Sequence, residues 1–146
     1  MSRAPEQPKD PIRWCAALAL AFLLGSLPFL TVVTHPYFDE VHYLPAAREF
    51  LTLGTFINRE HPLVGKELIA LGIALFGDNP WGWRLLPALF GTLALFAAMR
   101  ALWFGTQSRF ATLSYGVLAA TGFHLFIHAR IAMLDIFYLT FLCVAA

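Results

Sequence analysis

The stretch WCAALALAFLLGSLPFLTVVT, from Trp14 to Thr34, decides the fold, because its 21 residues carry no charge. An α-helix rises about 1.5 Å per residue, so about 20 apolar residues cross the hydrocarbon core of a bilayer. The whole chain has the matching composition, with 59% hydrophobic residues, 13% charged residues and a mean hydropathy of +0.67. The sequence therefore predicts an integral membrane protein whose first span covers 14–34.

Three further apolar runs predict an all-α, polytopic transmembrane protein with about four spans. They cover residues 81–104, 110–126 and 131–146. The last of them is about half a span long, so we expect it to be incomplete. The membrane domain would then occupy 14–146, after a polar cytoplasmic tail at 1–13.

The ends of the second run carry residue types that prefer the membrane interface. Trp81, Trp83 and Trp103 are placed like an aromatic belt. Arg84 and Arg100 are expected to extend outward to the lipid headgroups. Both features predict that this run crosses the bilayer.

The outer loop, residues 35–80, holds the longest charged stretch and must lie outside the hydrocarbon. Pro45 to Gly54 has a proline early and a glycine at its end, which predicts a short interfacial helix. Leu68 to Gly77 is apolar but too short to span, so we expect a re-entrant or surface-lying helix. The loop should therefore consist of amphipathic helices.

Positive residues orient this array. They flank one side of the spans: Arg3, Lys9 and Arg13 before the first, and Arg100 and Arg109 between the second and third. Such residues are enriched on the cytoplasmic side, so the outer loop and the segment 130–135 should face outward and meet across one cavity.

The long first run predicts a retained signal anchor. The net charge of +1, without a basic stripe, gives no indication of nucleic-acid binding.

Three motifs follow one another along the chain: FDEVH at 38–42, EHPLVGK at 60–66 and ARIAMLD at 129–135. In this order they resemble the start of a lipid-linked-sugar glycosyltransferase of the multi-span GT-C architecture. The family is that of the protein O-mannosyltransferases and the related aminoarabinose transferases of lipid A. The resemblance implies inverting transfer of a mannose-like sugar from a polyprenyl-phosphate donor to a hydroxyl of a protein, lipid or glycan. The reaction would take place at the outer face of a membrane, which we expect to be a bacterial cytoplasmic membrane rather than the endoplasmic reticulum.

Two carboxylates are the candidate catalytic residues. The resemblance implies that Asp39 is the base that takes a proton from the acceptor hydroxyl, and attack by a weakly acidic alcohol needs such assistance. From the residues alone, Asp39 also fits the N-cap of an interfacial helix. Asp135 lies at the edge of the fourth apolar run, where an unpaired carboxylate is costly. The resemblance places Asp135 in the same cavity as Asp39, and the alternative is a structural pair with Arg130 or with a neighbouring helix.

The remaining candidates would bind substrate or a metal ion. A lipid phosphate needs charge neutralisation, for which Arg130 and Lys66 are the available cations, although Arg130 also fits an arginine that extends to lipid headgroups. Glu40 and His61 complete the expected substrate-binding set. Glu60, next to His61, is a candidate ligand of a divalent metal ion, as in the aminoarabinose relatives; the alternative is a solvated loop carboxylate.

Other readings stay open. Leu63 replaces the second proline of the usual mannosyltransferase His-Pro-Pro, so the branch is in doubt and a lipid A-type aminoarabinose transferase is an alternative. Family members are several times longer, so the chain also fits a non-catalytic truncated product or a small subunit that needs a partner. A small transporter with a polar path through Asp39, Arg130 and Asp135 is a third class, but no pair of broken helices in matching halves supports it.

Overall fold

A computed structural model describes residues 8–55 and 57–146 of the chain, and these residues form helices and no strand. In chain order the elements are α1 (Ile12–Ser26), the 3-10 helix η1 (Leu27–Phe29), α2 (Glu40–Thr52), α3 (Leu63–Phe76), α4 (Pro80–Thr106), α5 (Arg109–Thr121), α6 (Phe123–His128) and α7 (Leu134–Ala145). The predicted all-α class is confirmed.

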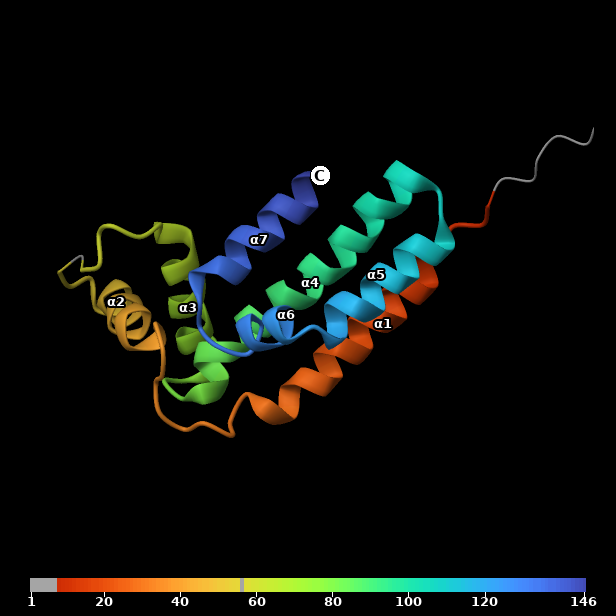
Figure 1. Ribbon diagram of the computed structural model, residues 1–146. Coiled ribbons are helices and arrows are strands. Elements are labelled where there is room, and N and C mark those ends of the chain that lie inside the picture. Colours follow the sequence, from red (N-terminus) through yellow and green to blue (C-terminus); the bar gives the residue numbers. More distant parts are fainter. Residues whose placement is uncertain (1–7, 56) are drawn as a thin grey trace, which may run out of the picture.

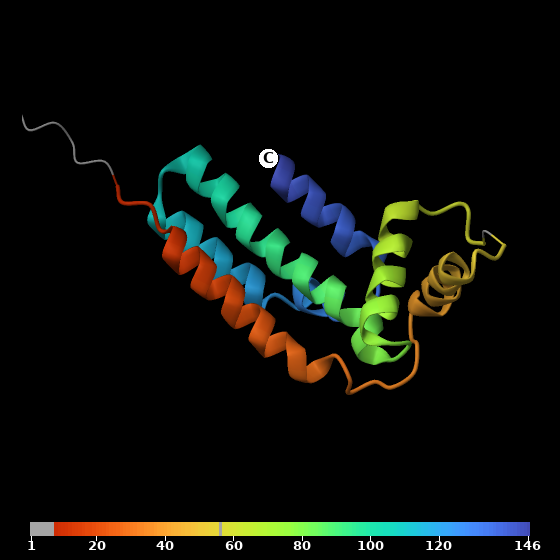
Figure 2. The same ribbon diagram turned by 180° about the vertical axis from the view of Figure 1, so that it is seen from behind.

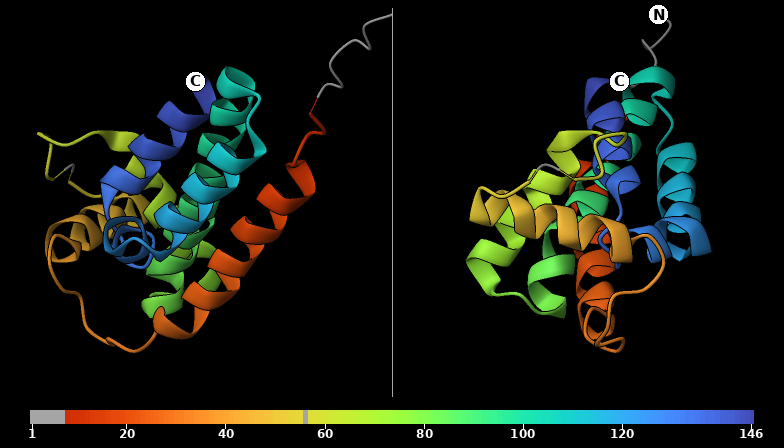
Figure 3. Two further views of the ribbon diagram at one scale, coloured as in Figure 1. Left: turned by 45° about the vertical axis from the view of Figure 1, so that its right-hand side comes forward. Right: turned by 90° about the vertical axis from the view of Figure 1, so that its left-hand side faces the viewer.

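Helix α4 is the centre of the molecule, because α1, α3, α5 and α7 all pack against it. Figures 1 and 2 show α1, α4, α5 and α7 running alongside one another. Helices α2 and α3 gather at one end of this bundle, and α2 lies across the direction of the long helices (Figure 3). The start of α1, the α4–α5 turn and the end of α7 lie toward the opposite end.

Among the described residues, two helical segments are long and apolar enough to cross a membrane, Ile12–Phe29 and Pro80–Thr106. The second begins sharply, because the Asn79 side chain accepts hydrogen bonds from the N–H groups of Trp81 and Gly82. Pro80 occupies the first turn, where its missing N–H costs nothing.

The other two predicted spans are shorter helices than the sequence suggested. Gly122 has an extended backbone, with ψ 131°, and divides the third apolar run into α5 and α6. Helix α7 has 12 residues and starts only after the extended Met133. The first helical segment likewise ends at Phe29, ahead of Thr34. The number of four spans therefore stays a prediction.

Three interface predictions for α4 were wrong. Trp83 and Trp103 are 6% and 3% exposed, and Arg84 is 1% exposed, whereas Trp81 remains exposed. The reason is that α4 is surrounded by other helices, so side chains on several of its faces are buried within the protein. Arg3, one of the cationic residues predicted to lie on the cytoplasmic side, lies outside the described residues.

The helices of the outer loop begin earlier than predicted. Helix α2 starts at Glu40 and contains Pro45, which removes a single N–H donor without ending the helix here. Helix α3 starts at Leu63, directly after the extended Pro62, and buries one face against α2 and α4. Both shifts bring the FDEVH and EHPLVGK motifs to helix starts.

Large apolar side chains are exposed along the outer sides of the bundle. Among them are Leu24 of α1, Leu118 of α5 and Phe141 of α7, which are 57%, 71% and 51% exposed. An apolar surface of this kind suits contact with lipid or with further helices.

Candidate active site

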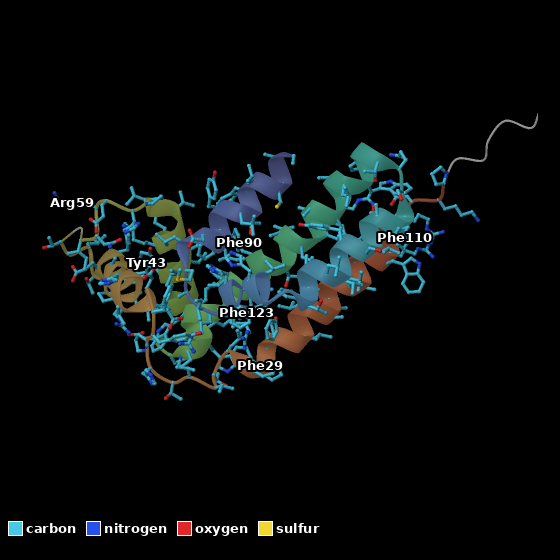
Figure 4. The ribbon with its side chains drawn as sticks, viewed as in Figure 1. Phe29, Tyr43, Arg59, Phe90, Phe110 and Phe123 are labelled. Carbon is cyan, nitrogen blue, oxygen red and sulfur yellow. The ribbon has the colours of Figure 1, made fainter. Side chains whose placement is uncertain are left out.

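A cavity of about 460 Å³ opens where α2, α3 and α7 come together. We call it the acidic cavity. Its polar lining consists of Asp39, Tyr43, His61, Asp135 and Tyr138, and its apolar lining includes Leu134, Phe137 and Phe141. Figure 4 places Tyr43 at this end of the molecule, with Phe110 at the opposite end. Two of the three sequence motifs thus supply carboxylates to one cavity, as the sequence led us to expect.

Asp39 lies at the N-cap position of α2, yet its side chain caps nothing. Its main-chain oxygen accepts hydrogen bonds from the N–H groups of His42 and Tyr43, at 2.9 and 3.1 Å, so the backbone starts the helix without help from the carboxylate. Phe38, just before it, has a φ of 55°, a left-handed conformation that is unusual for a bulky residue. Such strain is often found at functional sites. The geometry disfavours the cap interpretation and directs the carboxylate to the acidic cavity.

Asp135 occupies the first turn of α7, where the helix dipole favours a negative charge. Within residues 8–55 and 57–146, no ion pair joins it to Arg130 or to another cation. Its side chain is exposed and lines the acidic cavity instead. The structural pair with Arg130 is therefore not formed.

Tyr43 lies among the carboxylates and is only 6% exposed. Burial raises the pKa of its phenol, and the negative charges of Asp39, Asp135 and Glu60 raise it further. The phenol therefore remains protonated at neutral pH and is a hydrogen-bond donor. Its ring packs edge-on against His61, with the centroids 5.5 Å apart.

Sequence reasoning missed Tyr43 and Tyr138, although a signal was present. Tyr43 follows Asp39 by four positions, and Tyr138 follows Asp135 by three. On a helix, these spacings place two side chains on the same face. Once Asp39 and Asp135 are assigned to helix starts, each tyrosine is expected beside its carboxylate.

Arg130 lies apart from the acidic cavity. It lines a second cavity of about 170 Å³ with Arg84 and Tyr37. Its guanidinium is stacked on Phe126, 3.9 Å from the ring centroid, and its Nε–H donates to the Phe126 main-chain oxygen at 2.9 Å. The cation expected to bind phosphate thus lines a different cavity from the two carboxylates.

Glu40 and Lys66, both expected to bind substrate, are fully buried and do not line the acidic cavity. The Lys66 ammonium donates to the main-chain oxygen of Asn58. Burial lowers the pKa of Lys66, while the charge of Glu60 acts in the opposite direction. Among the described residues that line the acidic cavity there is no lysine or arginine.

Glu60 lies in a smaller cavity of about 200 Å³, next to Asp39, His42 and His61. Its carboxylate accepts a hydrogen bond from the Asn58 side-chain amide at 3.1 Å. In the part of the chain that the structure describes, no three His, Cys, Asp or Glu side chains converge closely enough to hold a metal ion. These residues do not by themselves form the metal site expected at Glu60.

Two described helical segments are apolar enough to cross a membrane, and among the described residues Asp39 and Asp135 line one cavity without forming an ion pair. The polyprenol-phosphate-mannose–protein mannosyltransferase of Corynebacterium glutamicum is 36% identical over 94% of this chain. The protein of that name from Mycobacterium tuberculosis is also 36% identical, over 95% of the chain. An undecaprenyl phosphate-α-4-amino-4-deoxy-L-arabinose arabinosyl transferase of Pseudomonas fluorescens is 31% identical over 73% of it.

The chain is therefore a homologue of the polyprenol-phosphate-mannose–protein mannosyltransferases and, more distantly, of the aminoarabinose transferases, both of GT-C type. The resemblance seen in the three motifs is confirmed. The chain spans about 29% of the length of the two mannosyltransferases and about 21% of the arabinosyl transferase. No family model matches the chain, and no solved structure matches it.

Proposed function

We propose that this chain forms the acceptor-activating part of a transferase that moves mannose from a polyprenyl-phosphate donor to a hydroxyl acceptor. The names of its homologues support the donor. Mannose is favoured over aminoarabinose because the mannosyltransferases match at higher identity and over more of the chain. Their names also favour a protein acceptor over a lipid or a glycan.

One observation carries the proposal: Asp39 starts a helix without capping it and faces the acidic cavity together with Asp135. A carboxylate without a partner is available as a base. The buried phenol of Tyr43 supplies a donor that can orient the acceptor or the sugar.

The proposed reaction is a single displacement. The Asp39 carboxylate takes the proton of the acceptor hydroxyl as its oxygen forms a bond to C1 of the sugar. The bond between C1 and the phosphate oxygen breaks, and its electron pair leaves with the polyprenyl phosphate. Attack from the face opposite the phosphate inverts the configuration at C1.

The phosphate must lie away from the acidic cavity, because two carboxylates repel an anion. Arg130 is the proposed phosphate partner. In the described residues its Nε–H is bonded to Phe126, and the other N–H groups of its guanidinium remain for phosphate oxygens. C1 of the sugar would then lie between Arg130 and Asp39, with the acceptor oxygen on the Asp39 side.

The absence of a cation among the described lining of the acidic cavity also favours a second candidate function. In that case the chain is a membrane subunit that needs cationic residues from a partner to hold the donor. It would bind acceptor or sugar but transfer nothing alone.

A chimera tests the proposed function. In a Corynebacterium glutamicum strain that lacks its own mannosyltransferase, this chain replaces the corresponding segment of that enzyme. Membranes are assayed with a Ser/Thr-containing peptide as the acceptor. Polyprenyl-phosphate mannose is the donor in one assay, and an undecaprenyl-phosphate aminoarabinose donor is used in a parallel one. Transfer of mannose alone supports the proposal. Transfer of aminoarabinose alone, or no transfer by a chimera that is made in normal amounts, contradicts it.

A further inference from the structure

The first turn of α2 is fixed by a buried ion pair between Glu40 and Arg84, whose exposed fractions are 0% and 1%. The Nε–H of Arg84 donates to one carboxylate oxygen at 2.8 Å, and an NH2 hydrogen donates to the other at 2.6 Å. This bidentate geometry is the strongest form of an arginine–carboxylate contact.

All remaining polar groups of the pair are also used. The other N–H groups of Arg84 donate to main-chain oxygens between α1 and α2, those of Leu30, Val33 and His35, at 2.8, 2.5 and 3.2 Å. Glu40 additionally accepts from the main-chain N–H groups of Ala132 and Tyr37, at 2.8 and 3.3 Å. These bonds occupy the five donors of a guanidinium and the roughly four acceptor positions of a carboxylate. Glu40 therefore has no lone pair left for a substrate.

The pair connects the two sides of the acidic cavity. Glu40 directly follows Asp39 at the start of α2, and Ala132 precedes Asp135 by three residues. Helix α2 packs mainly against α3, whereas α7 packs mainly against α4. The bond from Ala132 to Glu40 thus joins two segments that the helix packing holds separately.

We propose that Glu40 and Arg84 are positioning residues that set the separation of Asp39 and Asp135. Neither residue lines the acidic cavity, so both act through the backbone of the neighbouring residues. The consequence for catalysis rests on the proposed function. The consequence for structure does not, because it is a distance between α2 and α7.

The distance can be measured in the full 146-residue chain in lipid nanodiscs. Spin labels are placed at two exposed positions, Val41 of α2 and Leu142 of α7. Arg84→Lys keeps the charge but has three donors in place of five, and Glu40→Gln removes the charge while keeping the size. The matched control is Arg100→Lys, the same substitution on the same helix. Its wild-type arginine forms a bidentate pair with Asp10 at 2.5 and 2.7 Å.

The expected result is a broader distance distribution between the two labels in Arg84→Lys and Glu40→Gln, and an unchanged one in Arg100→Lys. A second label pair, Leu20 of α1 and Leu118 of α5, should be unaffected in every variant. Cys15 and Cys143 are replaced by alanine in all samples. An unchanged distribution in Arg84→Lys and Glu40→Gln overturns the proposal. Broadening of both label pairs also overturns it, because the ion pair would then stabilise the whole molecule.

The chimera gives the catalytic readout. A displacement of about 1 Å costs about 10²-fold in rate, so Arg84→Lys should lower turnover by that order. If the unsubstituted chimera transfers nothing, the proposed function fails, and the spin-label distances still decide the positioning role.

Discussion

Replacing Asp39 by asparagine separates a catalytic base from a helix cap. Asparagine has nearly the same size as aspartate and caps helices about as well, but it cannot take a proton at neutral pH. In this structure the Asp39 side chain forms no cap hydrogen bond. Asp39→Asn and Asp39→Ala should therefore both leave stability nearly unchanged, whereas loss of a true cap to alanine costs about 1 kcal/mol.

The effect on turnover should be much larger than the effect on stability. General-base assistance contributes about 10²–10⁴-fold. At about 1.4 kcal/mol per tenfold change, this corresponds to about 3–5.5 kcal/mol of transition-state stabilisation. Both substitutions should reduce mannose transfer by this order, because each removes the same carboxylate from the acidic cavity.

The assay uses the chimera, with transfer measured at saturating donor and stability measured by thermal unfolding of the purified protein in detergent. Asp10→Asn is the control, because Asp10 pairs with Arg100 near the start of α1, far along the chain from the acidic cavity. The reasoning is refuted if Asp39→Asn retains near-normal turnover, in which case Asp135 becomes the candidate base. It is equally refuted if Asp39→Ala unfolds the protein while Asp39→Asn does not.

Three further predictions concern orientation, packing and the cavity. A cysteine at Thr55, in a chain without the native two, should react with an impermeant maleimide in intact cells; labelling only after lysis would reverse the orientation. Gly65→Val should cost about 1–3 kcal/mol in thermal unfolding, since a Cβ at Gly65 would lie 2.7 Å from Leu134 Cδ2. Gly105→Ala, with nothing within 4 Å, should be neutral in the same measurement. Tyr43→Phe should lower transfer about 2- to 10-fold, because a hydrogen bond to a neutral hydroxyl contributes about 0.5–1.5 kcal/mol, and unchanged transfer would exclude a role for the phenol.

Local properties of the chain were predictable from the sequence. The run that begins at Trp14 and the run from Trp81 to Phe104 were recognised because length and hydropathy alone determine whether a helix is able to cross a bilayer. The order of the three motifs sufficed to identify the homologous proteins, since it requires only residue identity and spacing.

Helix boundaries were less predictable, for a physical reason that Pro45 illustrates. Proline is a strong local signal for a helix start, yet α2 begins at Glu40 and continues through it. The contacts of Glu40 with Arg84 and Ala132 hold this first turn, and they come from distant parts of the chain. A local signal of a few kcal/mol is outweighed when tertiary contacts of similar size oppose it.

The sequence by itself determined that the protein is helical, apolar and homologous to polyprenol-phosphate-mannose–protein mannosyltransferases. Only the tertiary structure decided which charged residues face a cavity and which face each other. Asp39 and Glu40 are neighbours of the same charge, and nothing local tells them apart. Glu40 is buried because Arg84 lies beside it, whereas Asp39 forms no ion pair with a described residue and lines the acidic cavity. The pairing of charges depends on packing between segments far apart in the chain, and hydropathy and spacing do not encode it.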